Sequence, residues 1–216
     1  MQHLRQLYST SFPLTLSCTA GSPPLRQLLI PSLWSIFLLA PLSTLAATTN
    51  VEARSLADLA QTCAPQVAYS TVRGIVKTES ALNPYAIGVD DHAKARPARQ
   101  PRNSYEGARL MQDLDALNVT YSAGLGQIHI SHIRKNKISA EQIFDPCFNL
   151  SWLQRVLTDC HSRALSRISV SGQKLTPKQL EQSALDLSLS CYNSGNFSTG
   201  FRNGYIQNVR KNAHKI

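Results

Sequence analysis

Several features that often reveal a protein's class are missing from this 216-residue sequence. It contains no internal repeat, no coiled-coil heptads and no low-complexity block, so solenoid and fibrous architectures are not expected. Its cysteines show no CxxC or Cys/His spacing, and His92 and His132 have no metal-ligand spacing, so we expect no metal and no cofactor. Both histidines are expected to be exposed. Charged residues make up only 16% of the chain and apolar residues 43%, which is enough for one compact domain and hardly for two.

The first 47 residues contain no acidic residue. Residues 28–47 form an apolar run that ends in small residues at Ala46 and Ala47, which is typical of a cleaved secretory signal peptide. Two prolines inside this run disfavour a permanent membrane helix, although an uncleaved anchor is the alternative. The stretch before the run is long for a signal peptide, which a start site assigned too far upstream would explain.

We therefore predict a signal peptide over residues 1–47 and one globular domain over residues 48–216, exported to the periplasm. The chain carries a net charge of +9, of which Arg5 and Arg26 in the leader contribute two. The remaining excess of cations is scattered, and the export signal disfavours a nucleic-acid partner.

Four cysteines remain in the predicted mature chain, which indicates two disulfides in an oxidising compartment: Cys63, Cys147, Cys160 and Cys191. If residues 146–165 form one helix, Cys147 and Cys160 lie roughly 20 Å apart, too far for a disulfide. Cys63 therefore pairs with either Cys160 or Cys147, and Cys191 with the cysteine that is left. The sequence does not choose between these two arrangements.

The mature chain is predicted to be mainly helical. Apolar residues recur at helical spacing in several segments, beginning at Leu56, at Pro65, at Ser104, at Asp145-Pro146 and at Thr176-Pro177. Asp145 and Thr176 suit N-caps, and the helix after Thr176 is expected to present Leu180, Ala184, Leu187 and Cys191 on one face. Residues 88–103 are polar and contain two prolines, so we expect an exposed loop or irregular insertion there.

Glu79 is the unusual residue of the second predicted helix. The apolar stripe Ala68, Val72, Ile75 and Val76 continues at helical spacing to this carboxylate. Desolvation on such a stripe raises the pKa of a carboxyl toward neutrality, as a general acid for glycosidic cleavage requires. By pattern alone, a helix-end glutamate that turns into solvent is the alternative.

Two further segments contain residues suited to a sugar-binding cleft. The first is Gly124-Leu125-Gly126-Gln127-Ile128, in which glycines allow close approach and the Gln amide can bind a sugar hydroxyl or acetamido group. The second is Tyr192-Asn193-Ser194-Gly195, followed by Tyr205. Taken singly, each is equally well explained as a turn or a helix terminator.

Together, Glu79-Ser80 with Asn83-Pro84 and these two segments occur in the order seen in lytic transglycosylases, which the chain resembles over about residues 55–210. Three further segments carry a closer resemblance to one group within that family: Cys63-Ala64-Pro65, the string Asn83 to Gly88, and Phe144-Asp145-Pro146-Cys147 with Asn149-Leu150. Within that family the chain is most similar to the peptidoglycan-cleaving component of type IV secretion and conjugation systems. The resemblance implies a mainly α, α+β lysozyme-like fold like that of goose-type lysozyme.

The resemblance also implies a reaction with one essential carboxylate. Glu79 would protonate the glycosidic oxygen between N-acetylmuramic acid and N-acetylglucosamine, and then remove a proton from the muramyl 6-hydroxyl to give a 1,6-anhydro end. No other acid has an evident place as its partner in the sequence. The residues implied to line or orient the cleft are Ser80, Gly124, Leu125, Gln127, Ile128, Tyr192, Asn193 and Tyr205, the last by a hydrogen bond near Glu79.

The chain departs from the family pattern at Ala81, where Gly is usual, and at His129, where Asn is frequent. The expected partners are peptidoglycan strands and components of a secretion or conjugation apparatus for which the enzyme opens the wall. Two alternatives remain open from the sequence. One is a muramidase that uses water as the nucleophile, and the other is a peptidoglycan-binding assembly protein without activity.

Overall fold

The computed structural model describes residues 55–89, 96–172 and 174–214. The predicted signal peptide and His92 lie outside these ranges. Nine helices and three short strands occur in the described part of the chain. They are α1 (Leu56–Cys63), α2 (Tyr69–Glu79), β1 (Ile87–Val89), α3 (Ser104–Ala116), β2 (Tyr121–Ala123), β3 (Ile128–His129), α4 (Ile130–Lys135), α5 (Ala140–Phe144), α6 (Pro146–Val170), α7 (Pro177–Ser194), α8 (Thr199–Arg202) and α9 (Tyr205–His214). The predicted mainly α fold with a small sheet is confirmed.

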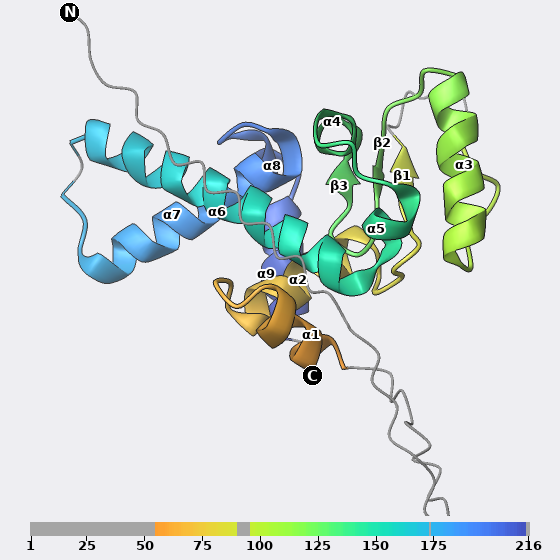
Figure 1. Cartoon of the computed structure of the whole chain (residues 1–216). Coiled ribbons are helices and arrows are strands. Elements are labelled where there is room, and N and C mark those ends of the chain that lie inside the picture. Colours follow the sequence, from red (N-terminus) through yellow and green to blue (C-terminus); the bar gives the residue numbers. More distant parts are fainter. Residues whose placement is uncertain (1–54, 90–95, 173, 215–216) are drawn as a thin grey trace, which may run out of the picture. The chain divides into compact units, whose positions relative to one another are not determined.

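The strands form one antiparallel sheet in the order β1-β2-β3, with Gly88 opposite Ser122 and Ser122 opposite His129. Figure 1 shows α3, α4 and α5 around this sheet, while α6 and α7 run side by side away from it. None of the helices in the described ranges combines the length and the apolar composition needed to cross a bilayer.

The longest helices begin where their caps were predicted. The Asp145 carboxylate accepts a hydrogen bond from the Phe148 amide (2.7 Å) ahead of Pro146 at the first turn of α6. Thr176 and Gln179 form a reciprocal capping box at the start of α7, and Gly195 ends that helix with a φ of 72°. These local signals satisfy the free amides and carbonyls of the helix ends, so they fix where each helix starts and stops.

Two disulfides join elements that are distant in sequence. Cys63 of α1 is bonded to Cys147 of α6, with Cα atoms 5.2 Å apart, and Cys160 of α6 is bonded to Cys191 of α7, with Cα atoms 5.7 Å apart. This is one of the two arrangements that the sequence left open. Both bonds terminate on α6, which therefore anchors α1 at one point and α7 at another.

The helix that carries Glu79 packs closely on the last helix. A Cβ on Gly74 of α2 would lie 2.6 Å from the Val209 carbonyl oxygen of α9, so only glycine permits this approach. The Arg210 guanidinium of α9 forms a short ion pair with Asp186 of α7 at 2.5 Å. The core is thus continuous from α2 through α9 to α7.

Several local predictions were wrong. Pro65 does not open the second helix: the Val67 amide bonds to the Ala64 carbonyl (3.1 Å) and closes a turn, so α2 begins four residues later at Tyr69. Ala68 is exposed rather than part of the buried stripe. Leu180 is 37% exposed because the end of the α6–α7 hairpin extends beyond the core.

The polar segment after β1 is tied to the sheet in its described part. The Gln100 side chain accepts a hydrogen bond from the Ile87 amide (2.8 Å) and donates one to the Ile87 carbonyl (2.9 Å), as a neighbouring strand would. Arg99 forms an ion pair with Glu106 of α3 at 2.6 Å. Residues 96–103 are therefore an irregular insertion that covers the edge of β1.

Candidate active site

Glu79 is the last residue of α2, and its carboxylate lines a cavity of about 460 Å³. The cavity lies between the sheet with α4 on one side and α6 with α7 on the other. Its walls are formed by Glu79, Ser122, Gln127, His129, Ser131, His132, Val156, Asp159, Cys160, Arg163, Cys191, Tyr192, Asn193, Ser194 and Gly195. A partly open space of this size, with a largely polar wall that includes two acids, suits part of an extended polar ligand.

The carboxyl group of Glu79 is partly buried and has one side-chain partner. The Tyr205 hydroxyl of α9 donates a hydrogen bond to Glu79 Oε1 at 2.5 Å, which is the contact expected near this residue. Burial raises the pKa of Glu79 to about 7, although the Tyr205 hydrogen bond acts in the opposite direction. Because this value lies near neutrality, the group can both give and accept a proton under mild conditions.

A buried tyrosine, Tyr205, and a partly buried one, Tyr192, belong to the site and have different partners. Tyr205 is only 5% exposed and lies behind Glu79, outside the cavity wall. Tyr192 lines the cavity, and its hydroxyl donates to the Gly126 carbonyl at 2.6 Å. Burial raises the pKa of both hydroxyls well above the usual range, so both stay protonated and act as hydrogen-bond donors.

The glycine-rich segment forms the turn between β2 and β3. Gln127 lines the cavity, and its amide nitrogen donates to the carbonyls of Ala86 (3.0 Å) and Gly124 (2.9 Å). Leu125 and Ile128 are buried in the core and do not line the cavity. Of the five residues in this segment, only Gln127 faces the cavity; the others shape the turn.

The two glycines of the turn are required by close packing against α6 and α7. Gly124 has a φ of 81°, and a Cβ there would collide with the side-chain amide of Asn149. A Cβ on Gly126 would lie 2.8 Å from the Tyr192 hydroxyl oxygen. Asn149 itself is buried, accepts from the Gly126 amide (2.7 Å) and donates to the carbonyls of Ala123 (3.1 Å) and Ile143 (2.9 Å). These three hydrogen bonds of Asn149 fix the position of the turn that carries Gln127 into the cavity wall.

Two other predicted cleft residues lie in different surroundings. Ser80 is buried, its hydroxyl donates to the Val76 carbonyl (3.0 Å), and it is not part of the cavity wall. Asn193 lines the cavity, and its side-chain oxygen accepts from Asn203 at 2.9 Å. The structure therefore brings Glu79, Gln127, Tyr192 and Asn193 to one cavity, with Tyr205 directly behind the acid.

The two departures from the family pattern now have local structural descriptions. Ala81 has a φ of 50° and Leu82 a φ of 71°, so the chain leaves α2 through two left-handed residues. A left-handed residue other than glycine costs about 1 kcal/mol, which explains why Gly suits position 81. His129 lines the cavity and caps α4, where its Nδ1 accepts from the Ser131 amide at 3.2 Å.

The sequence of the chain is similar to a known protein family and to named proteins. Residues 58–215 match the transglycosylase SLT domain family. The chain belongs to this family. The type IV secretion system protein virB1 of Brucella suis biovar 1 (strain 1330) is 39% identical over 156 residues, which cover 70% of this chain and 60% of that protein. Protein virB1 of Agrobacterium fabrum (strain C58) is 26% identical over 182 residues, covering 84% of this chain and 69% of that protein. No solved structure gives a significant match.

The chain spans about 60% of the length of the Brucella relatives that it matches. The SLT domain accounts for nearly all of the described residues, since its match begins in α1 and ends beyond α9. The recognised family thus covers both the acid on α2 and the tyrosine on α9.

Sequence reasoning missed part of this SLT domain's cavity. His132 is not exposed as expected: it is half-buried against Trp152, at 6.1 Å between ring centroids, and burial lowers its pKa. In the sequence no acid has an evident place as the partner of Glu79, and nothing there indicates that Asp159 of α6 lines the same cavity. In the sequence, Asp159 has the spacing of a residue on the solvent-exposed face of α6. Only the packing of α6 against α7 shows that this side chain lines the cavity.

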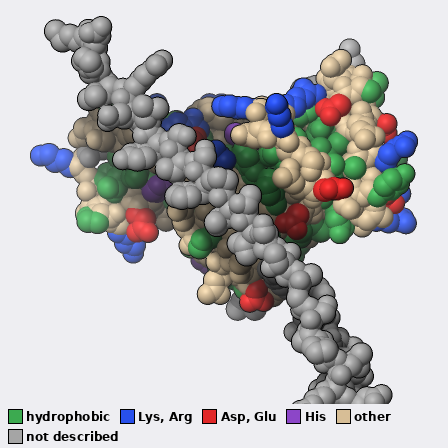
Figure 2. Space-filling view, in the orientation of Figure 1, with side chains coloured by type: hydrophobic (Ala, Val, Ile, Leu, Met, Phe, Trp, Pro, Cys, Tyr) green, Lys and Arg blue, Asp and Glu red, His purple; other side chains and the backbone are tan. Residues whose placement is uncertain are grey.

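Within the described ranges, no three His, Cys, Asp or Glu side chains lie close enough together to bind a metal ion. On the face visible in Figure 2, Lys and Arg side chains occur in several separate places rather than in one continuous stripe.

Proposed function

We propose that this protein is a peptidoglycan lytic transglycosylase that cleaves the β-1,4 bond between N-acetylmuramic acid and N-acetylglucosamine, with Glu79 as the acid and base. The observation that carries the proposal is a single desolvated carboxyl group, with a pKa raised to about 7, at a polar cavity in an SLT domain. A glycosidic oxygen needs a neutral acid to protonate it, and burial keeps Glu79 neutral at mildly acidic pH.

The Tyr205 hydrogen bond orients the two oxygens of Glu79. Because the tyrosine donates to Oε1, the proton of the neutral acid resides on Oε2, which leaves Oε2–H to donate to the glycosidic oxygen. After the transfer, the same hydrogen bond stabilises the carboxylate. One residue can therefore serve first as the acid and then as the base.

The proposed reaction proceeds in two steps. Glu79 protonates the leaving oxygen while the bond to the muramyl anomeric carbon breaks, and the substrate's own acetamido oxygen bonds to that carbon. The Glu79 carboxylate then takes the proton from the muramyl 6-hydroxyl, whose oxygen displaces the acetamido group and forms the 1,6-anhydro ring. The carboxyl group ends in its starting state, and no water is consumed.

The second carboxylate of the cavity does not provide an obvious partner for this chemistry. Asp159 is paired with Arg163 at 3.0 Å, and its side chain is 67% exposed. A carboxylate with a bound cation and ready access to water has little driving force to act as a base or nucleophile. This arrangement favours the one-acid reaction over hydrolysis by two acids.

The residues around the acid are proposed to bind the glycan. Gln127, Tyr192 and Asn193 line the cavity and offer amide and ring surfaces to the sugars. Gly124, Leu125 and Ile128 act through the shape of the turn, and Ser80 through the end of α2. Tyr205 acts on Glu79 alone.

The decisive experiment is mass analysis of muropeptides released from purified sacculi by the wild type and by Glu79→Gln. We expect products that lack one water relative to hydrolysed ends, and loss of at least a thousandfold in rate for the variant. Glu141→Gln makes the same chemical change on an exposed helix residue and serves as the matched control. If Glu79→Gln still cleaves the sacculi, Glu79 is not the acid. If the products of the wild type have reducing ends, the enzyme is a muramidase.

The cellular role is proposed from the relatives. Two groups of virB1 proteins resemble the chain, and the Brucella ones are named as type IV secretion system proteins. We infer that this protein is exported to the periplasm, with residues 1–47 as its signal peptide, and opens the wall for a secretion or conjugation apparatus. Amino-terminal sequencing of the periplasmic protein tests the cleavage, and a start near residue 48 is expected.

A further inference from the structure

We propose that Arg163 is a specificity residue that binds a carboxylate of the peptide stem carried by the glycan strand. The proposal rests on the proposed function, because it concerns the substrate of the same cavity. Arg163 lies on α6, about two turns before that helix ends at Val170, and it lines the cavity that contains Glu79. Among the described residues of that wall, it is the one Lys or Arg side chain.

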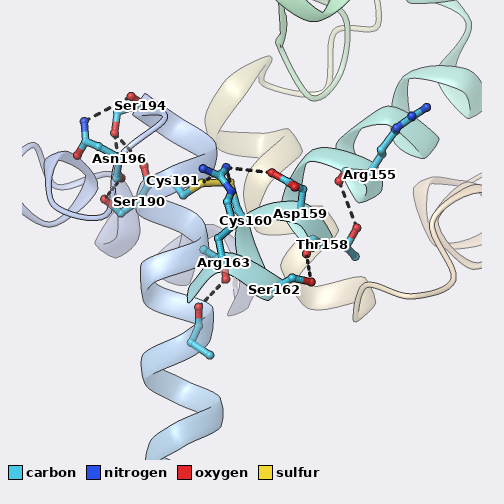
Figure 3. Close-up of a disulfide and its surroundings, with 12 residues drawn as sticks. Arg155, Thr158, Asp159, Cys160, Ser162, Arg163, Ser190, Cys191, Ser194 and Asn196 are labelled. Atoms are coloured by element: carbon cyan, nitrogen blue, oxygen red, sulfur yellow. Dashed lines mark hydrogen bonds and ion pairs between the residues drawn. A yellow bond between two sulfur atoms is a disulfide. The ribbon is translucent and has the colours of Figure 1, made fainter. Parts of the chain in front are cut away.

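The guanidinium of Arg163 is held in place from several sides. Its Nη2 pairs with the Asp159 carboxylate at 3.0 Å and contacts the sulfur atoms of Cys191 (3.0 Å) and Cys160 (3.4 Å). Figure 3 shows it beside the disulfide, with a dashed line to Asp159. Its carbon also lies 5.9 Å from the centre of the Phe197 ring. A long side chain fixed in this way loses little freedom when it binds a ligand.

The fixed guanidinium still has donors to offer. All of its polar contacts with described residues use Nη2, which leaves Nε and Nη1 without a protein partner in that part of the chain. The side chain is 51% exposed, so these donors are accessible to a ligand. A guanidinium has the planar geometry that matches a carboxylate.

The substrate offers carboxylates at the right kind of place. Glycan strands are uncharged along the sugar backbone where the muramyl lactyl group is joined to a peptide, and the free carboxylates belong to that peptide. Arg163 is paired with Asp159 and not with Glu79, so its charge suits the peptide rather than the scissile bond. Asp159 would repel a carboxylate, so binding requires Arg163 to outweigh it.

The test compares two substrates that differ only in charge. Soluble strands with intact peptides are assayed beside the same strands after their peptide carboxylates have been converted to methylamides with carbodiimide and excess methylamine. The measured quantity is the ratio of kcat/KM for native strands to kcat/KM for amidated strands. We expect Arg163→Gln to lower this ratio about tenfold, through KM, because one charge-assisted contact is lost.

Three further variants separate charge from structure. Arg167→Gln is the matched control, because Arg167 lies one turn further along α6, 5.8 Å from the same Phe197 ring, and outside the cavity wall; its ratio should equal that of the wild type. Arg163→Lys keeps the charge and should recover part of the ratio. The double variant Arg163→Gln with Asp159→Asn should keep the low ratio.

Each other outcome overturns the proposal. If Arg163→Gln leaves the ratio of kcat/KM unchanged, Arg163 does not bind the peptide carboxylates. A ratio that the double variant restores shows that repulsion by Asp159, not attraction by Arg163, caused the loss. Equal loss in Arg167→Gln assigns the effect to packing on Phe197. If the wild type cleaves neither substrate, the proposed function itself fails, which is distinguishable from all of these.

Discussion

Replacing Tyr205 by Phe removes one hydroxyl group and keeps the ring that packs behind the acid. The removed group is the donor to Glu79 Oε1, and its hydrogen bond lowers the pKa of a carboxyl that burial raises to about 7. Without the hydroxyl, the desolvation that raises the pKa is unopposed. The pKa of Glu79 is therefore expected to rise further.

The size of the change follows from the strength of the bond. A hydrogen bond to a charged group contributes about 1.5 to 3 kcal/mol, but the neutral acid also accepts part of it through its carbonyl oxygen. We take the lower end of that range as the difference between the two protonation states. Since one pKa unit corresponds to about 1.4 kcal/mol, the expected rise is about one unit.

The assay is the pH dependence of kcat/KM for strand cleavage, which reports ionisations of the free enzyme. Glu79 must be protonated to act as the acid, so activity falls as the pH rises through its pKa. The midpoint of this alkaline limb should lie about one pH unit higher in Tyr205→Phe than in the wild type.

Tyr121→Phe is the matched control. Tyr121 is also a buried tyrosine, but its hydroxyl faces Asp115 at 3.4 Å on the other side of the sheet. Its alkaline limb should coincide with that of the wild type. A limb in Tyr205→Phe that stays in place or moves downward would refute the assignment of Glu79 as the titrating acid with Tyr205 as its donor.

The remaining predictions concern stability. Because the folded pKa of Glu79, about 7, lies above the unfolded value of 4.5, the free energy of unfolding falls by up to about 3 kcal/mol as the pH rises through about 7. Glu79→Gln should therefore be more stable than the wild type by that amount near pH 8 but not near pH 4, which denaturant unfolding measures. Asn149→Ala leaves three buried backbone groups unpaired and should lower the free energy of unfolding by about 3 kcal/mol or more. Ala81→Gly relieves a left-handed alanine and should raise it by about 1 kcal/mol. Replacing Cys63 and Cys147 by Ser should cost about 4.6 kcal/mol, because their bond closes 84 residues.

The sequence predicted what depends on neighbouring residues. The caps at Asp145 and Thr176 were confirmed, because each side chain accepts from the amide three residues further on, and Gly195 ends α7 because it takes the left-handed conformation. The approach of Tyr205 to Glu79 was expected only through the family resemblance, since 126 residues separate the two.

The sequence could not predict what depends on packing between distant elements. The disulfide arrangement needed the positions of α1 and α7 relative to α6. Asp159 and Arg163 resemble any i, i+4 ion pair on a solvated helix face until α7 and its disulfide close the cavity beside them. In the sequence, Pro65 is compatible with the first position of a helix. In the structure, the hydrogen bond from the Val67 amide to the Ala64 carbonyl closes a turn there, and the helix begins at Tyr69.

The proposed acid and the proposed peptide-binding residue come from helices in different surroundings. Glu79 and Tyr205 come from α2 and α9, which pack too closely at Gly74 for a side chain there, so the core holds the acid and its hydrogen-bond donor together. Arg163 comes from α6, where its side chain is 51% exposed and its contacts are with Asp159, the Cys160–Cys191 disulfide and Phe197. It follows that the raised pKa and the proposed chemistry depend on the interior of the fold. If Arg163 binds the peptide as proposed, single substitutions on α6 can change which peptide charge the enzyme prefers, and they leave Glu79 and its surroundings unchanged.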